Sequence, residues 1–259
     1  MTSSNCSSCG PWLSSALFLT CLMLFSACST TKRTKDYYSN DVLHPVNEVL
    51  KEDAISPLDV YDPWEGFNRR SYTFNYYFDK YLFLPVVDTY DFLTPEILQD
   101  AISNIFSNLS DIRNLLNSAF QLKGERTAKT GGRLLLNTTV GLGGIWDPAT
   151  QVGLYQQDED FGQTLGYYGV GEGPYVVLPI FGPSNVRDGL GLLADSAMYY
   201  PIDPLNLATH RDYETIIAGA NAIDTRHNIS FRYFETGSPF EYEMLRFLYL
   251  KKRELDIGK

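Results

Sequence analysis

The sequence predicts a mainly α-helical protein with at most one short β-hairpin. Apolar residues recur at helical spacing along most of the chain after about residue 60. Strand character is confined to Tyr175–Leu178, an apolar run between glycine and proline. Aromatic residues make up 14% of the chain, including 18 Tyr and 15 Phe. Such rings suit either a boundary between apolar and wet phases or a tyrosine-rich core, and composition leaves both open.

The N-terminus resembles the leader of a bacterial lipoprotein. Residues 1–27 contain no Asp, Glu, Lys or Arg, and the apolar run ends in Leu24-Phe25-Ser26-Ala27 before Cys28. The run is shorter than the ~20 residues that cross a membrane, which favours a signal peptide. We therefore expect cleavage before Cys28, a diacylglyceryl and an N-acyl chain on that cysteine, and no other cofactor. The alternative is a secreted protein with an incidental cysteine.

The remaining cysteines and the charge exclude several classes of protein. Cleavage would remove Cys6, Cys9 and Cys21, so Cys6 and Cys9 cannot form a redox or zinc motif in the mature chain. The net charge of −10 and the pI near 4.8 argue against nucleic-acid binding, which needs clustered Lys and Arg. Contact with a membrane would have to come from acyl chains and apolar surface.

The chain then divides into a tether and a helical body. Residues 28–59 are polar and interrupted by prolines, which is typical of a flexible tether behind a lipidated N-terminus. We expect the folded domain to span 60–255. Its first helix places Phe67, Phe74, Phe78 and Leu82 on one face.

The second helical segment has a clear start. Thr94 is the expected N-cap and Pro95 the first helical residue. An apolar stripe follows from Ile97 to Leu109, a break is expected at Ser110-Asp111, and Gly124 is the expected stop.

Shorter elements complete the body. We expect a helix at Glu125–Thr139, then the apolar, low-bulk stretch Gly141–Trp146. Asp158–Asp160 can cap a short helix, and Ser184 can cap another after the strand. Two amphipathic helices are predicted near 211–227 and 240–256.

The sequence offers little for catalysis. His44, His210 and His227 lack metal-ligand spacing and are expected to be exposed or hydrogen-bonded. No Gly-x-Ser-x-Gly elbow occurs in the chain. An enzyme would need Arg187 with Asp188, or Asp62 with Glu65, to form a site.

Several stretches, in order, resemble the MlaA/VacJ family of outer-membrane lipoproteins. The matching segments are Asp62-Pro-Trp-Glu-Gly-Phe-Asn-Arg69, Asn104-Ile-Phe-Ser-Asn-Leu109, Asn137-Thr-Thr-Val-Gly141, Gly143-Gly-Ile-Trp-Asp147, Phe161-Gly-Gln-Thr-Leu-Gly166, Gly169-Val-Gly-Glu-Gly-Pro-Tyr175 and Arg187-Asp188. The series runs from about 60 to 255. Pro148 departs from the usual aliphatic residue, and an acidic tail that some members carry is absent.

The resemblance implies a ring-shaped, membrane-embedded helical lipoprotein on the periplasmic leaflet of the outer membrane. Such a protein removes mislocalised phospholipids from the outer leaflet through an amphipathic channel. It passes them to a soluble periplasmic carrier of the Mla pathway, maintains lipid asymmetry and associates with trimeric porins; it is not an enzyme. The residues that the resemblance and the motifs place on the lipid path are Asn68, Arg69, Phe74, Gly141, Gly143, Gly169, Gly171, Gly173, Pro174, Tyr175, Leu178, Pro179, Arg187 and Asp188.

Two alternatives accompany this function: a non-transporting envelope scaffold or surface-interaction lipoprotein, and an envelope hydrolase. For Arg187 itself, paired hydrogen bonds to a headgroup phosphate compete with a salt bridge to Asp188, Asp195 or Asp62. Residues Tyr175–Phe181 are expected to present apolar surface beside the channel.

Overall fold

A computed structural model describes residues 60–202 and 211–259. The predicted signal peptide 1–27, Cys28, the tether 28–59, His44 and His210 lie outside the described residues. The elements in chain order are α3 (Glu65–Phe78), the π-helical turn η2 (Asp79–Phe83), α4 (Leu84–Leu93), α5 (Glu96–Phe120), α6 (Gly124–Thr139), α7 (Pro148–Gln151), α8 (Phe161–Tyr167), β1 (Tyr175–Leu178), β2 (Gly182–Asn185), α9 (Val186–Ile202), α10 (Arg211–His227) and α11 (Glu241–Gly258). The protein is mainly helical, as the sequence predicts.

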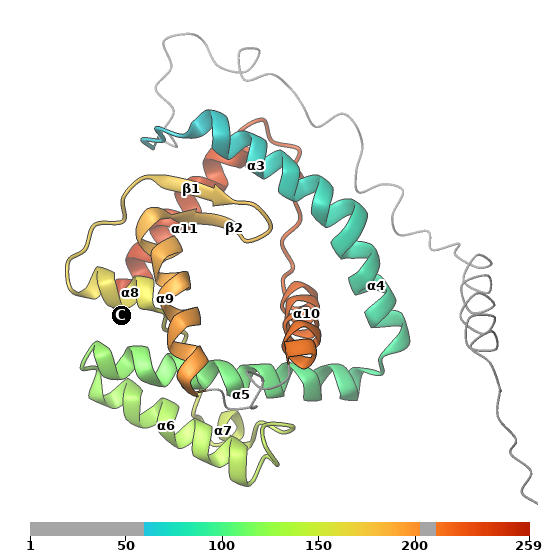
Figure 1. Cartoon of the computed structure of the whole chain (residues 1–259), viewed down its shortest axis with the longest axis vertical. Helices are drawn as coiled ribbons and strands as arrows, with labels where there is room; N and C mark the ends of the chain where they lie inside the picture. The colour runs from blue at the N-terminus through green and yellow to red at the C-terminus, as the bar shows by residue number, and fades with distance from the viewer. Residues whose placement is uncertain (1–59, 203–210) are drawn as a thin grey trace, which may run out of the picture. The chain divides into compact units, whose positions relative to one another are not determined.

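The elements of the described body succeed one another around a ring (Figure 1). The chain passes from α3 through η2 and α4 into α5, α5 packs against α8, and α8 packs against α9. α9 meets β2, and β1 returns to α3, so the circuit is closed by contacts between segments more than 100 residues apart. α10 lies on the inner side of the ring against α4 and α5.

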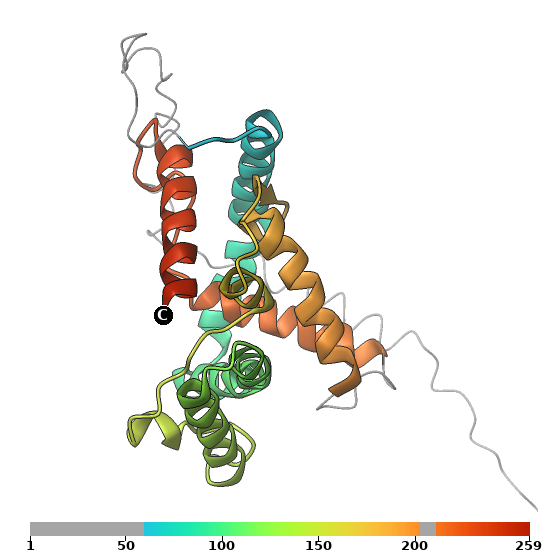
Figure 2. The ribbon, with the colours of Figure 1, turned by 90° about the vertical axis from the view of Figure 1, so that its left-hand side faces the viewer.

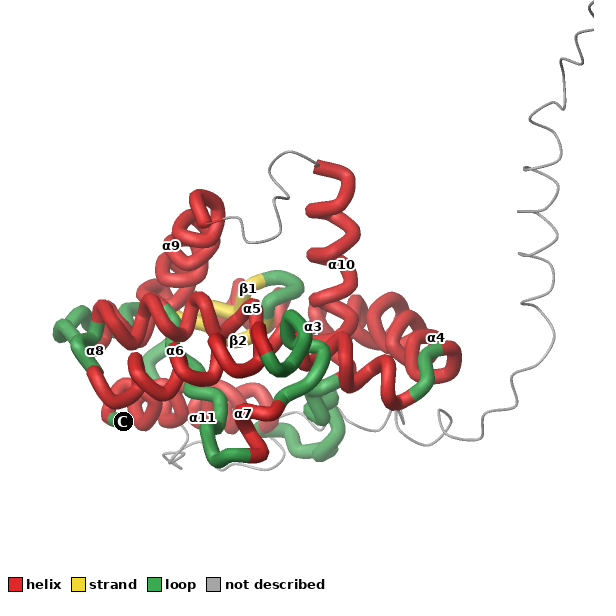
Figure 3. Tube along the Cα trace, turned by 90° about the horizontal axis from the view of Figure 1, so that it is seen from below, coloured by secondary structure: helices red, strands yellow, loops and turns green. Residues whose placement is uncertain are grey.

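Two helices, α11 and the ring helix α9, extend to opposite sides of α3 (Figure 2). In Figure 2, α11 stands on one side of α3 and α9 on the other. Figure 3 shows the same arrangement from below, with α9 and α10 projecting to one side and α7 and α11 lying on the other. α6 packs along the outer side of α5 and carries α7 at its end. No described helix combines the length and the apolar character that crossing a membrane would need.

The sheet is a single antiparallel hairpin within the described residues. Tyr175 pairs with Asn185 and Leu178 with Gly182, so β1 has the bounds that the sequence predicts. The tip, Pro179–Phe181, turns through Ile180, whose φ is +72°. A β-branched residue in that region is strained, so the surrounding contacts must hold the turn.

Most predicted helices are confirmed, with corrections at their ends. α6, α10 and α11 match their predicted ranges closely, and Asp160 caps α8 by accepting from the Gln163 amide at 2.8 Å. α5 is continuous through Ser110-Asp111, so the predicted break is wrong. Thr94 ends α4 rather than capping α5.

Two terminal residues also change role. Gly124 begins α6 instead of stopping α5, which ends at Phe120. Asn185, not Ser184, accepts the Asp188 amide at the start of α9, at 2.7 Å. Glycine and asparagine both occur at helix ends, and local patterns place such an end only to within one or two residues.

Burial is inverted relative to a water-soluble helical protein. The buried apolar residues of the described chain are few, namely Tyr72, Val87, Ala149, Tyr175, Val177 and Tyr242. The faces that the helices bury are instead polar: Asn68, Ser71 and Asn75 on α3; Asn108, Asp111, Asn114, Asn117 and Ser118 on α5; Thr130, Arg133 and Asn137 on α6. Their spacing of three, four and seven residues keeps each set on one helix face.

A buried apolar cluster joins α3, the hairpin and α11. Tyr72, Tyr175, Val177 and Tyr242 form it, and Tyr72 meets Tyr242 edge-on with ring centroids 5.9 Å apart. The Tyr72 hydroxyl donates to Glu241 at 2.6 Å, so its polar end is satisfied inside the cluster. Burial, together with that carboxylate, raises the pKa of Tyr72 far above its ordinary value. This cluster closes the ring where its two ends meet.

Candidate functional site

The hairpin is attached to α3 by two asparagines. Asn68 donates to the Tyr175 carbonyl at 3.1 Å and accepts from the Val177 amide at 2.8 Å. Two helical turns later, Asn75 repeats this pattern, donating to the Leu178 carbonyl at 3.0 Å and accepting from the Ile180 amide at 2.7 Å. The two amides therefore replace a third strand along the free edge of β1, and satisfy backbone groups that would otherwise be orphaned.

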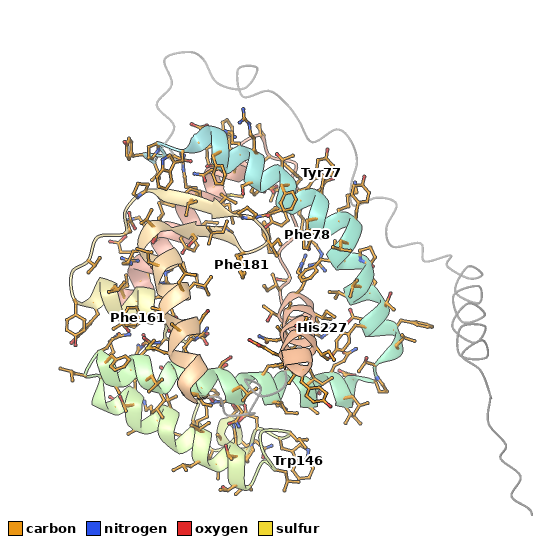
Figure 4. The ribbon with its side chains drawn as sticks, viewed as in Figure 1. Tyr77, Phe78, Trp146, Phe161, Phe181 and His227 are labelled. Carbon is orange, nitrogen blue, oxygen red and sulfur yellow. The ribbon has the colours of Figure 1, made fainter. Side chains whose placement is uncertain are left out.

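The hairpin has one packed face and one exposed tip. Tyr175 and Val177 are buried against α3 and α11, while Ile180 and Phe181 are exposed at the turn. In Figure 4, Phe181 points toward the middle of the ring. The expectation that Tyr175–Phe181 present apolar surface therefore applies to the tip, whereas Tyr175 itself belongs to the core. Phe161, also labelled in Figure 4, is the first residue of α8.

The base of the hairpin is a closed network of charges. Arg187 Nε lies 2.9 Å from Asp188 Oδ1, and Arg253 Nε lies 2.7 Å from Asp188 Oδ2. Arg253 also donates two hydrogen bonds to the Asp160 carboxylate, at 2.7 and 2.8 Å. For Arg187, the salt bridge to Asp188 is thus the alternative that the structure contains. Its Nη2 is buried without a hydrogen-bond partner among the described residues.

The electrostatics of this network favour the charged forms. Burial alone would raise the pKa of Asp188, but hydrogen bonds from Arg253 and Arg187 outweigh it and hold that pKa below its ordinary value. The pKa of Asp160 is likewise lowered, because Arg253 offsets its burial. Gly162 is required here: a Cβ at that position would lie 2.5 Å from Asp188 Oδ1.

The other predicted path residues occupy varied places. Arg69 bridges Glu65 at 2.7 Å and Glu243 on α11, and stacks over Tyr242 at 4.4 Å. Phe74 is half exposed and stacks on Phe78 with centroids 6.0 Å apart. Leu178 is partly buried in β1, while Pro174 precedes that strand and Pro179 follows it.

The predicted glycines divide by backbone geometry. Gly169 and Gly173 have φ of +85° and +68°, so a side chain would strain both, whereas Gly171 lies in open space. Gly143 also has a positive φ, of +78°, and Gly141 lies between the backbone carbonyls of Asn137 and Trp146, each of which would be 2.4 Å from a Cβ.

Two buried ion-pair clusters were missed by sequence analysis. Arg226 on α10 forms a two-point contact with Asp79 of η2, at 2.6 and 2.9 Å. Arg133 on α6 bonds Asp111 on α5 at 2.8 Å and Asp147 at 2.6 Å. For Arg133 and Asp111 the signal was the row of polar residues at helical spacing on α5 and α6; for Arg226 and Asp79 the sequence holds no comparable signal.

The Arg133 cluster perturbs its two acids in opposite directions. Burial raises the pKa of Asp111, despite the hydrogen bonds it accepts. Burial also opposes ionisation of Asp147, but hydrogen bonds from Thr150, Arg133 and Asn137 overcome it and lower that pKa to about 2.

The one described histidine has a structural partner. His227 is the last residue of α10 and is labelled in Figure 4. Its Nδ1 lies 2.7 Å from Asp91 of α4, and its ring meets that of Tyr90 edge-on. This agrees with the expectation that it is hydrogen-bonded. Within residues 60–202 and 211–259, no group of three or more His, Cys, Asp or Glu could hold a metal ion.

The chain is similar in sequence to several bacterial proteins, some of them named as lipoproteins of a phospholipid transport system. The chain is 36% identical over 201 residues to an uncharacterized protein of Rickettsia prowazekii, covering 77% of this chain and 78% of that one. It is 37% identical over 145 residues to the Escherichia coli protein named intermembrane phospholipid transport system lipoprotein MlaA, covering 54% of this chain and 57% of the relative. The corresponding Haemophilus influenzae protein is 32% identical over 143 residues, covering 54% of this chain and 57% of that one.

The fold is similar to a solved structure described as "Structural basis for maintenance of bacterial outer membrane lipid asymmetry". The TM-score is 0.61 at 30% sequence identity, and the match covers 76% of this chain and all of that one. The family model of the MlaA lipoprotein matches residues 60–256. That match spans the whole ring, its hairpin and α11, so this chain belongs to the MlaA lipoprotein family.

Proposed function

We propose that this chain is an outer-membrane lipoprotein that removes mislocalised phospholipids from the outer leaflet. It is held by the lipid on Cys28, with its body in the periplasmic leaflet. Lipids descend through the ring and pass to a soluble periplasmic carrier, which maintains lipid asymmetry. The proposal also includes the trimeric porin partner that the family resemblance implies.

The observation that carries the proposal is the inverted burial. Exposed large apolar side chains occur on every part of the ring, from Phe67 and Phe74 on α3 to Phe92 on α4 and Leu193 on α9. Large apolar side chains exposed on so many elements are unusual for a water-soluble monomer, which mostly exposes such residues singly. Acyl chains would cover that surface, while most of the buried asparagines, aspartates and arginines between the helices bond one another away from lipid.

The ring suits a molecule with two incompatible halves. A charged headgroup in hydrocarbon is costly, so a lipid that changes leaflet needs polar and apolar surface together. The exposed tip of the hairpin, directed at the middle of the ring, offers Phe181 to the acyl chains. Because Asp188 engages the Nε of Arg187, that arginine supports the hairpin base, while its Nη2 is left without a partner among the described residues.

The contacts of the predicted catalytic pairs favour transport over hydrolysis. Asp188 is engaged by two arginines and Tyr249, and Asp62 accepts from Asn68, Tyr242 and Arg246. Carboxylates held in this way support the fold and are poorly placed for proton transfer to a substrate. The scaffold alternative is separated from transport by experiment.

The test is labelling of outer-leaflet phospholipid in cells that lack the gene. We expect raised labelling in the deletion strain, rescue by the wild type, and failure of rescue by Cys28→Ala. Arg187→Ala should also fail, whereas Arg70→Ala should rescue, because Arg70 is exposed on α3. Unchanged labelling in the deletion strain would refute transport and favour the scaffold. Released fatty acid that depends on one carboxylate would favour the hydrolase.

A further inference from the structure

We propose that Arg113, on the inner face of α5, binds the phosphate group of a phospholipid as the lipid passes through the ring. The inference rests on the proposed function, since it takes phospholipid to be the cargo, and it names a side chain that holds the headgroup. Neither the family resemblance nor the sequence motifs place Arg113 on the lipid path.

Helix geometry places Arg113 on the side of α5 that faces the ring. The opposite side of α5 packs against α6, where Asp111 accepts from Arg133 at 2.8 Å. On that same side, Asn108 donates to Thr138 of α6 at 3.2 Å. Two residues further along an α-helix is a rotation of ~200°, which turns Arg113 away from α6. Since α6 lies along the outer side of α5 (Figure 1), Arg113 lies on the inner face.

The guanidinium of Arg113 has unused hydrogen-bonding capacity. The side chain is half-buried, and its Nε is buried without a hydrogen-bond partner among the described residues. By contrast, Arg133 and Arg226 each contact a buried carboxylate, at 2.8 and 2.6 Å. A buried donor without an acceptor lowers the stability of a protein, so such groups are rare. An acceptor that arrives with a ligand would account for this one.

Asp195 of α9 lies close enough to interact with Arg113 by charge, but other groups hold that carboxylate. Asn117 donates to its Oδ1 at 2.9 Å, and the Phe161 amide donates to its Oδ2 at 3.0 Å. Burial raises the pKa of Asp195, although these hydrogen bonds and the charge of Arg113 oppose the rise. The carboxylate is thus bonded to α5 and to the start of α8, and the guanidinium remains available to an anion inside the ring.

The inner face of α5 on either side of Arg113 is apolar. Arg113 is the one Lys or Arg within α5. The residues seven and four positions before it and three and seven positions after it share its face and are at least partly exposed: Phe106, Leu109, Leu116 and Phe120. A guanidinium forms paired hydrogen bonds with a phosphate, and the apolar residues suit the acyl chains that a phospholipid carries. Free phosphate would make no use of them, so the surroundings favour a lipid.

The first test measures capture of a headgroup beside Arg113. Cleavage before Cys28 would leave that lipidated cysteine alone in the mature chain, so an introduced cysteine provides a single free thiol. Ser110→Cys places the thiol three residues before Arg113, on the neighbouring turn. Full-length mature protein in detergent micelles is mixed with phosphatidylethanolamine that carries a maleimide on its headgroup nitrogen, and the adduct is measured by mass spectrometry. We expect Arg113→Met to lower the cross-linked fraction about tenfold, because charge-assisted hydrogen bonds to the phosphate are lost.

Matched probes and variants identify the source of the phosphate. A maleimide-bearing diacylglycerol, which has no phosphate, should react equally slowly with and without Arg113. Arg113→Lys should restore part of the cross-linking, because an ammonium keeps the charge but not the paired geometry. Arg70→Met, at an exposed arginine of α3, should leave cross-linking unchanged. Equal cross-linking in Arg113→Met and its parent would overturn the proposal. So would protection of the thiol by inorganic phosphate as complete as that by unlabelled phospholipid, since the site would then belong to the free ion.

Stability separates a binding arginine from a structural one. In micelles without phospholipid, Arg113→Met should unfold at the same denaturant concentration as the wild type or at a higher one, because it removes a buried donor that has no acceptor. An arginine that supports the fold would show the opposite change. Loss of stability together with loss of cross-linking would therefore assign Arg113 to the fold and refute the site.

The proposal and the proposed function fail separately in cells. If outer-leaflet phospholipid rises in the deletion strain and Arg113→Met restores asymmetry as fully as the wild type, transport stands and the Arg113 site is refuted. If labelling is normal in the deletion strain, the proposed function itself fails. The cross-linking result then still decides whether Arg113 binds a phospholipid.

Discussion

Replacing Arg226 with methionine tests whether buried ion pairs, and not apolar packing, hold the ring together. Arg226 lies in the last turn of α10 and Asp79 opens η2, and both are almost fully buried. Besides its two bonds to Asp79, the guanidinium donates to the carbonyls of Ile229 and Phe231 at 2.8 and 3.1 Å. The Arg226 side chain thus joins the end of α10 to η2.

The magnitude follows from what the substitution leaves behind. Arg226→Met keeps most of the volume but leaves the Asp79 carboxylate buried without its partner, which costs about 3–5 kcal/mol of unfolding free energy. Arg226→Lys should fall between, because an ammonium cannot span both carboxylate oxygens. The double variant Asp79→Leu/Arg226→Met removes the orphaned charge and should recover about 2 kcal/mol or more.

The assay is denaturant unfolding in detergent micelles, followed by near-ultraviolet circular dichroism. The control Arg70→Met changes an exposed arginine on α3 and should stay within about 0.5 kcal/mol of the wild type. The reasoning fails if Arg226→Met costs less than about 1 kcal/mol, or if the double variant is no more stable than the single one.

Three further predictions concern the acids, the hairpin and one glycine. The pKa of Asp147 is lowered to about 2, so the stability that its carboxylate contributes is present above about pH 4 and is lost as the pH falls toward 2. In Asp147→Asn the unfolding midpoint should therefore depend less on pH between about pH 4 and pH 2 than it does in the wild type. Asn75→Ala leaves two backbone groups of the hairpin tip without partners, so amide exchange at the tip should accelerate while exchange in α5 is unchanged; equal acceleration in both would contradict this. Gly162→Ala places a methyl group 2.5 Å from Asp188 and should destabilise the protein by about 2 kcal/mol or more, whereas Gly219→Ala, in open space on α10, should be neutral or stabilising by roughly 0.5 kcal/mol; similar midpoints for the two would refute the packing argument.

The helices could be predicted from the periodicity of the sequence, but the sequence did not tell which face of each helix is buried and which is exposed. The stripe of Phe67, Phe74 and Leu82 lies at helical spacing, and α3 and its continuation are helical. All three side chains are nevertheless exposed, and Asn68 and Asn75 take the buried face. Periodicity reports only that two faces differ. Which one is covered depends on the surrounding medium, and a local pattern does not contain that information.

The site shows the same limit. The strand Tyr175–Leu178 and the cap at Asp160 could be predicted, because both depend on neighbours within a few residues. The contact of Asn75 with the hairpin and that of Arg226 with Asp79 join residues more than 100 positions apart. The sequence spacing of Asn75 and Arg226 does not identify their partners, so these contacts could be found only from the three-dimensional structure.

The net charge illustrates why bulk composition misjudges this kind of protein. A value of −10 suggests an acidic surface that anionic lipid would repel. Yet Asp79, Asp111, Glu159 and Asp188 are directed inward to arginines, where they stabilise contacts between helices. Acids used in this way contribute little to the field outside. A ring whose charges face one another and whose apolar residues face outward can therefore lie in a leaflet without a spanning helix. In the arrangement proposed above, this apolar surface would add to the lipid on Cys28 in attaching the ring, whatever the formal charge.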